Sequence, residues 1–270
     1  MIAGIWQGNF RHSSMAELVK LAVSDGLIPR YVYKYRSINE NTKSILSNAR
    51  LWFSKPSDFN DPFDCQLVVQ ANNSEHDIAT FLRKNAPSMS SKDVKKYSRH
   101  WSKNLPKWRN LINQTINEHI NNAGICCFAG NCENILMWSH YSEAHKGICL
   151  KFDILADPEF FSIPLKVKYD TEYPKYDHVK DSSNLVQHLI MTKSECWKYE
   201  EELRVLKDHF GPVHFQKETL SEVIFGCNCP PNSIAEIKEI LSDNFYPNIR
   251  LKKARTSKDS FKLEIGDLKQ

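Results

Sequence analysis

Short stretches of alternating or continuous apolar residues recur along the chain, and polar, Gly or Pro residues separate many of them. Alternation is typical of a half-buried strand, and a short apolar run bounded by turn residues is typical of a buried one. The pattern predicts strands at 31–35, 51–53, 124–128, 147–152, 163–169, 203–206, 220–225 and 249–253.

Other segments repeat their apolar residues with the period of one buried helix face. Trp108, Ile112 and Ile116 follow this rhythm within a long stretch that lacks strand-like alternation. Ser233 stands where an N-cap is expected, just ahead of a run with Ile234 and Ile237 on one face. We predict helices at 16–26, 41–48, 75–122, 184–191 and 233–241.

The order of these elements bears on the fold class. Strands and helices do not alternate strictly, which argues against a doubly wound parallel sheet. We therefore predict a single α+β domain over residues 1–270, with a mixed, mainly antiparallel sheet as its core. A helical insertion is expected at about 75–122 and a basic C-terminal tail at about 254–270.

Composition agrees with a folded chain. Of 270 residues, 41% are hydrophobic and 25% are charged, with a net charge of only +4. No apolar run approaches the roughly 20 residues of a membrane helix, and residues 1–11 do not resemble a signal peptide. We expect a cytoplasmic protein with no membrane contact, whose eight scattered cysteines are reduced and bind no structural metal.

Several nucleotide-binding and hydrolase motifs are missing. The sequence has no Gly-x-Gly-x-x-Gly, no Walker-type Gly-Lys-Ser/Thr, no Gly-x-Ser-x-Gly and no His-Glu-x-x-His. A Rossmann oxidoreductase, a P-loop nucleotidase and an α/β-hydrolase are therefore disfavoured.

The segment Trp197–Arg204 carries the strongest local signal for chemistry. If Glu202 begins the strand that follows, Glu200 and Glu202 share one face, because side-chain direction repeats every two residues. Two neighbouring carboxylates raise at least one pKa, as functional sites often do. A solvated helix end, in which Glu202 pairs with Lys198 or Arg204, explains the segment equally well.

Two further segments combine aromatic, basic and titratable residues. Trp138–Tyr141, followed by His145, offers groups that stack, donate and titrate near neutral pH, although a single histidine here is better explained as a structural one. Tyr33–Arg36 places Lys34 and Arg36 on one side of a predicted strand, which suits a phosphate or nucleotide and suits an exposed edge strand equally well.

A basic segment, Lys92–Arg109, interleaves lysines and arginines with Tyr97, Trp101 and Trp108. Such a segment could bind single-stranded nucleic acid by charge and stacking. We favour a solvated helix face with its aromatic residues turned inward.

Taken in order, five segments resemble a bacterial family of proteins of unknown function, family 2971. The segments are Tyr33–Arg36, Leu51–Ser54 with Phe59–Asp64, Leu136–Tyr141 with His145–Gly147, Trp197–Arg204 and Val223–Gly226.

The order of these motifs is also similar to that of ADP-ribosyltransferases, and this resemblance implies a related sheet core and the use of NAD as substrate. It implies that Glu202 acts on the ribose with Glu200 assisting, and that the other motif residues bind NAD: Lys34, Tyr35, Arg36, Trp138, His140 and Tyr141. The acceptor of ADP-ribose would be a protein, DNA, RNA or water, and such an enzyme would suit a toxin or an anti-phage effector.

Two other functions stay open. A nuclease could use His140, His145 and acidic residues, with or without a metal ion. A non-catalytic sensor could bind a nucleotide or a nucleic acid without turnover, in which case the Lys92–Arg109 face would matter most.

Overall fold

A computed structural model describes residues 14–268, and these residues form two compact units. Unit 1 consists of Lys55–Ala123 and Lys168–Glu195. Unit 2 consists of the described residues before Lys55, Gly124–Val167 and the described residues from Cys196 onward. The fold is α+β with mainly antiparallel sheets, as the sequence predicts. Each unit is described by itself.

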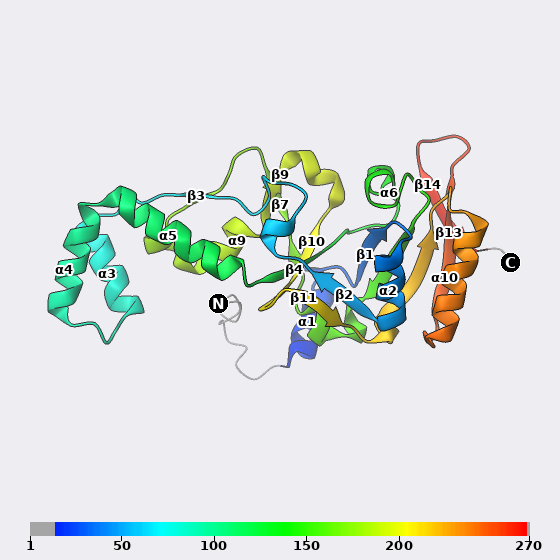
Figure 1. Cartoon of the computed structure of the whole chain (residues 1–270), viewed down its shortest axis with the longest axis horizontal. Helices are drawn as coiled ribbons and strands as arrows, with labels where there is room; N and C mark the ends of the chain where they lie inside the picture. The colour runs from blue at the N-terminus through cyan, green and yellow to red at the C-terminus, as the bar shows by residue number, and fades with distance from the viewer. Residues whose placement is uncertain (1–13, 269–270) are drawn as a thin grey trace. The chain divides into compact units, whose positions relative to one another are not determined.

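Unit 2 is built on a five-stranded sheet (Figure 1). Its strands, in spatial order, are β1 (Tyr31–Arg36), β5 (Ile148–Asp153), β12 (Leu220–Phe225), β13 (Arg250–Thr256) and β14 (Leu263–Asp267). Neighbours are antiparallel except β12 and β13, which are parallel and are connected by helix α10 (Pro231–Asp243). The sheet is therefore mixed, with one crossover.

A second sheet of unit 2 has the order β4 (Gly124–Phe128), β10 (Leu203–Lys207) and β6 (Leu165–Lys166), all antiparallel. A separate pair joins β2 (Arg50–Phe53) to β11 (Gly211–His214). The end of β4 is linked to β1 by reciprocal backbone bonds between Tyr33 and Ala129, with N···O distances of 3.0 and 2.7 Å. This bridge positions β4, and with it the paired strand β10 that begins within the Trp197–Arg204 segment, next to the larger sheet.

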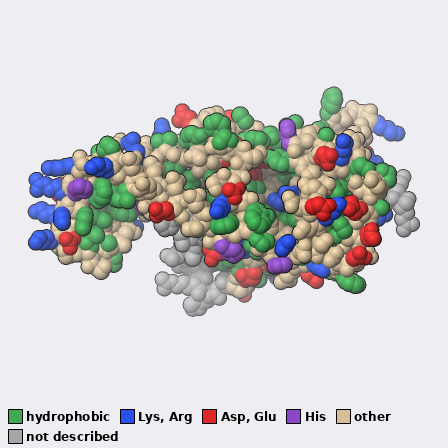
Figure 2. All heavy atoms as spheres, in the orientation of Figure 1, with side chains coloured by type: hydrophobic (Ala, Val, Ile, Leu, Met, Phe, Trp, Pro, Cys, Tyr) green, Lys and Arg blue, Asp and Glu red, His purple; other side chains and the backbone are tan. Residues whose placement is uncertain are grey.

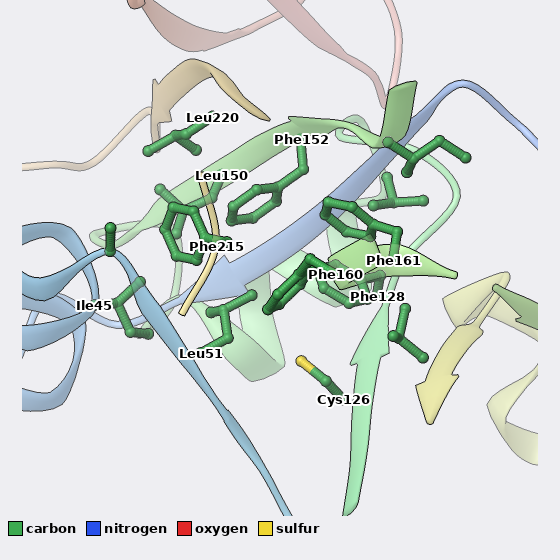
Figure 3. Close-up of a cluster of buried hydrophobic side chains, with 14 of the residues drawn as sticks. Ile45, Leu51, Cys126, Phe128, Leu150, Phe152, Phe160, Phe161, Phe215 and Leu220 are labelled. Atoms are coloured by element: carbon green, nitrogen blue, oxygen red, sulfur yellow. The ribbon is translucent and has the colours of Figure 1, made fainter. Parts of the chain in front are cut away.

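The main core of unit 2 is rich in phenylalanine (Figure 3). Phe152 of β5 meets Phe128 of β4 edge to face, with ring centroids 5.8 Å apart. Phe161, from the short helix α7 (Pro158–Phe161), packs on both rings. Edge-to-face packing of aromatic rings contributes roughly 0.5–1.5 kcal/mol per pair beyond burial itself. The apolar runs predicted as strands thus meet in one cluster.

Two helices of unit 2 begin where a side chain caps the first turn. Helix α1 (Met15–Ser24) starts with a capping box between Ser14 and Glu17, and α2 (Glu40–Asn48) is capped by Asn39. These side chains satisfy backbone N–H groups that have no partner in the first helical turn. Among the described residues of this unit, the other helices longer than one turn are α6 (Ile135–Tyr141) and α10.

Unit 1 contains the helices α3 (Glu75–Asn85), α4 (Ser91–Ser102) and α5 (Leu105–Ile120), so the helical insertion predicted at about 75–122 is present. Trp101 of α4 packs on Trp108 of α5, with ring centroids 5.3 Å apart. The rest of the unit has two parallel strand pairs, β3 (Val68–Val69) with β8 (Lys175–Tyr176) and β7 (Lys168–Asp170) with β9 (Thr192–Ser194). It also has two short helices, α8 (His178–Asp181) and α9 (Leu185–Leu189).

Single turns of 3-10 helix connect several of these elements. They are η2 (Pro56–Asp58), η3 (Ile154–Ala156), η4 (Ser182–Asn184), η5 (Glu195–Glu200) and η6 (Lys217–Thr219).

Several details differ from the sequence predictions, and three of them bear on the sheets and on α10. The strand expected at 163–169 is two strands, β6 and β7. The alternation of apolar residues continues through both, but β6 pairs with β10 and β7 pairs with β9. Helix α10 begins at Pro231 rather than after Ser233, since the fixed φ of proline suits the first helical position. The segment predicted as a basic tail contains β14, whose Leu263 and Ile265 pack with Ala254 of β13.

Within residues 14–268, no helix combines the length and the apolar character that crossing a membrane requires. Residues 1–11, on which the absence of a signal peptide was judged, lie outside the described residues.

Candidate active site

Helix α6 is fastened to the segment that precedes β10. Asn134 caps the helix, with its Oδ1 accepting from the backbone N–H groups of Leu136 and Met137 at 2.9 and 3.2 Å. Its Nδ2 donates to the carbonyl oxygen of Tyr199 at 2.5 Å. One asparagine therefore caps the start of α6 and binds the segment before β10, so the Trp138–Tyr141 and Trp197–Arg204 motifs are brought together.

Trp138 and Tyr35 form the packed base of this region. Trp138 is completely buried, and its Nε1 donates to the carbonyl oxygen of Cys132 at 2.8 Å. Its ring meets Tyr35 edge to face, at a centroid distance of 5.2 Å, and Tyr35 donates its own hydroxyl to Asn131. Burial raises the pKa of Tyr35 far above its ordinary value. Both residues were expected to bind NAD; both are buried, and a part in NAD binding stays a prediction.

A row of accessible rings lies above this base. His140 is exposed, and its ring lies 6.1 Å from that of Tyr199, which in turn lies 6.0 Å from Trp197. Tyr199 and Trp197 are half-buried. Neither was proposed as a ligand-binding residue from the sequence, although both belong to the motif that was singled out. The row offers flat surfaces on which a planar ring can stack.

Glu200 is the carboxylate next to this row. Its side chain is buried, and its Oε1 accepts a hydrogen bond of 2.6 Å from the hydroxyl of Tyr141, a half-buried residue of α6. Hydrogen bonds to an ionised acceptor are short and about twice as strong as neutral ones. The structure therefore brings together two residues that are 59 positions apart and that were both singled out from the sequence.

Glu202 has a different environment. Both of its oxygens accept from Arg204, at 2.8 Å from Nε and 3.2 Å from Nη2, and the side chain of Arg204 is completely buried. The neighbouring Cys127 is half-buried, and desolvation of its thiol followed by the charge of Glu202 holds its pKa well above the usual value. The ion pair with Arg204 was one of two explanations for this segment, although the sequence suggested an exposed pair.

The expected sharing of one strand face by Glu200 and Glu202 is wrong. Strand β10 begins at Leu203, and Glu200 ends the 3-10 helix η5. Between them Glu201 adopts a left-handed backbone with φ of 46°, which breaks the two-residue period on which the prediction rested. Glu200 accepts from Tyr141, whereas Glu202 accepts from Arg204.

Lys34 and Arg36 lie on the face of β1 that carries the buried Val32. The Nζ of Lys34 donates to the carbonyl oxygen of Cys127 at 2.8 Å. Arg36 approaches Thr42 of α2, with Nε 3.4 Å from the hydroxyl oxygen, and burial lowers its pKa from the ordinary value. Both cations thus contact protein groups, and a phosphate-binding role for them stays a prediction.

His145 is held against Trp138 rather than beside the carboxylates. The two rings stack with centroids 6.3 Å apart, and Nε2 of His145 lies 3.1 Å from the hydroxyl of Ser139. Its backbone φ of 68° is left-handed, and burial lowers its pKa from the usual 6.5. These contacts agree with the structural interpretation of a single histidine.

The described residues, 14–268, contain no group of three or more His, Cys, Asp or Glu side chains that could hold a metal ion. The nuclease alternative, with His140 and His145 as metal-assisted groups, thus gains no support from the arrangement of these side chains.

Comparison with known proteins adds one finding. The model of the family described as "Protein of unknown function (DUF2971)" matches residues 137–205. No curated protein and no solved structure matches the chain. The matched stretch runs from helix α6 to strand β10 and includes Tyr141, Glu200, Glu202 and Arg204. In this stretch, about a quarter of its length, the chain is similar to that family.

Proposed function

We propose that this protein cleaves the nicotinamide–ribose bond of NAD and transfers ADP-ribose to a protein or nucleic-acid acceptor, with Glu200 as the reactive carboxylate. The observation that carries the proposal is the 2.6 Å hydrogen bond between Tyr141 and Glu200, next to the row formed by His140, Tyr199 and Trp197. A likeness to the ADP-ribosyltransferase fold is part of the same proposal.

The chemistry needs a fixed negative charge. Cleavage of an N-glycosidic bond passes through an oxocarbenium-like state, in which positive charge develops on the ribose. A carboxylate that is already oriented stabilises this charge without reorganising during the reaction. Tyr141 supplies that orientation, because its hydroxyl fixes Oε1 of Glu200.

The accessible rings would hold the planar parts of NAD. His140, Tyr199 and Trp197 offer surfaces for the nicotinamide or adenine ring. A general base for the acceptor is also needed, and His140, which is exposed, is the candidate from this row. The sequence had assigned His140 to NAD binding.

Glu202 takes a positioning role in this proposal. Its charge is paired with the buried guanidinium of Arg204, so it is poorly placed to stabilise a second cation. The pair instead fixes the start of β10, directly after the turn that carries Glu200. The catalytic role expected for Glu202 thereby passes to Glu200, two residues earlier.

The test is incubation of the full chain with adenine-labelled NAD and a cell lysate, with release of nicotinamide measured at the same time. We expect nicotinamide release together with label on protein or nucleic acid. Transfer of label to an essential macromolecule would suit a toxin or an anti-phage effector.

Two variants sharpen this test. Glu200→Gln should lower nicotinamide release on the order of 100- to 1000-fold, as for other preorganised electrostatic groups. Glu218→Gln is the matched control, because Glu218 is an acidic residue of η6 outside this region. NAD binding without nicotinamide release would instead indicate a sensor, and no binding at all would refute the proposal.

A further inference from the structure

The strongest concentration of unpaired charge lies in unit 1, apart from the candidate site. Between Arg83 and Arg109 the sequence has nine Lys and Arg residues and a single acid, Asp93. The whole chain carries only +4, so the remaining residues are net acidic. Figure 2 shows basic side chains gathered over the helices that Figure 1 labels α3 and α4.

Five of these residues form a row along α4, which we call the α4 cation row. The row consists of Lys92, Lys95, Lys96, Arg99 and Lys103. Their spacing of three and four residues puts them on one side of the helix. With a rise of about 1.5 Å per residue, the row extends roughly 16 Å. All five residues are exposed.

The opposite side of α4 is used for packing. Val94 and Ser98 are buried, and Trp101 packs on Trp108 of α5. The orientation of the cations is therefore fixed by the fold of the unit. The aromatic residues turn inward, as we expected from the sequence, with the exception of Tyr97, whose side chain is 41% exposed.

The cations of this row have no acidic partner among the described residues. Asp93, the acid nearest in sequence, accepts from Ser90 in the N-terminal cap of α4. Lys96 contacts only the ring of Tyr97, with its Nζ 5.6 Å from the ring centroid. In the folded chain these charges are consequently available to a partner.

We propose that the α4 cation row binds the phosphate backbone of a nucleic acid. A regular row of fixed cations complements a regular row of phosphates, and neutralising phosphates releases condensed counterions. A membrane surface fits less well, because helices that lie on membranes expose large apolar side chains on the side that enters the lipid, whereas α4 exposes Tyr97 alone of its large hydrophobic residues. This inference does not depend on the proposed NAD chemistry.

The experiment measures binding of the full chain to a labelled mixed-sequence RNA or DNA strand by fluorescence anisotropy. With five contacts, log K should fall with log salt at a slope of about −3.5, which is roughly a 100-fold loss between about 50 and 200 mM salt. Two variants each remove three exposed lysines: Lys92→Gln/Lys95→Gln/Lys96→Gln in the row, and Lys20→Gln/Lys238→Gln/Lys258→Gln in unit 2. Glutamine is a good helix former, so α4 should be retained.

The row variant should bind more weakly and show a slope smaller by about 2, while the unit 2 variant should keep both values near those of the wild type. Equal weakening in both variants, or none in the row variant at an unchanged melting temperature, would overturn the proposal. Binding to phosphatidylserine vesicles or to polyglutamate that equals or exceeds nucleic-acid binding would also overturn it.

Discussion

The cations that pair with the buried carboxylates Glu202 and Glu222 in unit 2 and those of helix α4 are used in opposite ways. In unit 2, Arg204 is completely buried and bound to Glu202. A second buried carboxylate, Glu222, is contacted by Lys151 at 3.2 Å and Lys252 at 3.4 Å. In α4, by contrast, five exposed cations have no acidic partner among the described residues.

This difference separates two roles of charge. A buried ion pair is costly to break, since removing one partner leaves an uncompensated charge in the interior. An exposed cation costs the fold almost nothing, and it stays free for a partner whose binding depends on salt. The comparison predicts large stability effects in unit 2 and small ones in α4, whatever the reaction is.

The largest effect is expected for Arg204→Met. It removes the buried guanidinium that donates to both oxygens of Glu202, which should lower the free energy of unfolding by about 3–5 kcal/mol. Denaturant unfolding measures this change. The double variant Glu202→Gln/Arg204→Met should recover a large part of the loss, because neither charge then remains. A double variant as unstable as Arg204→Met would contradict the ion-pair account.

Tyr141→Phe should have the next largest effect, and it should act on turnover. A hydrogen bond to a charged group contributes about 1.5–3 kcal/mol, so loss of the Tyr141–Glu200 bond should slow nicotinamide release roughly 10- to 100-fold. Tyr173→Phe is the matched control, because Tyr173 is exposed in unit 1. Undiminished release in Tyr141→Phe would exclude Tyr141 as the group that orients Glu200.

A smaller effect depends on pH. Burial lowers the pKa of His145 below 6.5, so the folded state binds fewer protons than the unfolded state when the pH falls below that value. The contribution of His145 to stability is then fully present above about pH 6.5, and it is lost as the pH falls through the pKa of the folded state. The melting temperature of the wild type should therefore drop between about pH 7.5 and pH 5.

His145→Asn isolates that contribution, because asparagine tolerates the left-handed backbone at this position. The variant loses the stack on Trp138 and should be less stable at every pH, yet its melting temperature should vary less with pH than that of the wild type. Parallel pH profiles for the two proteins would show that His145 does not contribute.

The smallest effect is expected in α4. Lys95→Gln removes an exposed charge without an acidic partner, so the free energy of unfolding should change by no more than about 0.5 kcal/mol. Calorimetric melting of this variant beside Arg204→Met gives the comparison in a single experiment. A loss approaching that of Arg204→Met would mean that the row has structural partners.

The fold was largely predictable from periodicity. The aromatic alternation at Tyr31–Tyr35 and the helical rhythm through Trp108, Ile112 and Ile116 correspond to β1 and α5. The pattern of apolar residues could not show which strands pair with each other. It gives no sign that β6 and β7 have different partners, and the lysines near β14 conceal the alternation of Leu263 and Ile265.

The candidate site was predictable in its residues but not in its geometry. The motifs containing Tyr141, Glu200 and Glu202 were recognised, and the structure brings Tyr141 and Glu200 into contact. The left-handed turn at Glu201 could not be anticipated, because an acidic residue gives no sequence signal for positive φ. Asn134 could have been found, since an asparagine ahead of an apolar helix start is typical of an N-cap.

The most direct test of the central claim is a side-by-side measurement of stability and nicotinamide release for Glu200→Gln and Glu202→Gln. We predict that Glu202→Gln loses about 3–5 kcal/mol of stability, because buried Arg204 loses its anion, and that it keeps most of its turnover at a temperature where it is folded. We predict that Glu200→Gln stays folded and loses turnover on the order of 100- to 1000-fold. A stable but inactive Glu202→Gln, beside an active Glu200→Gln, would contradict the account.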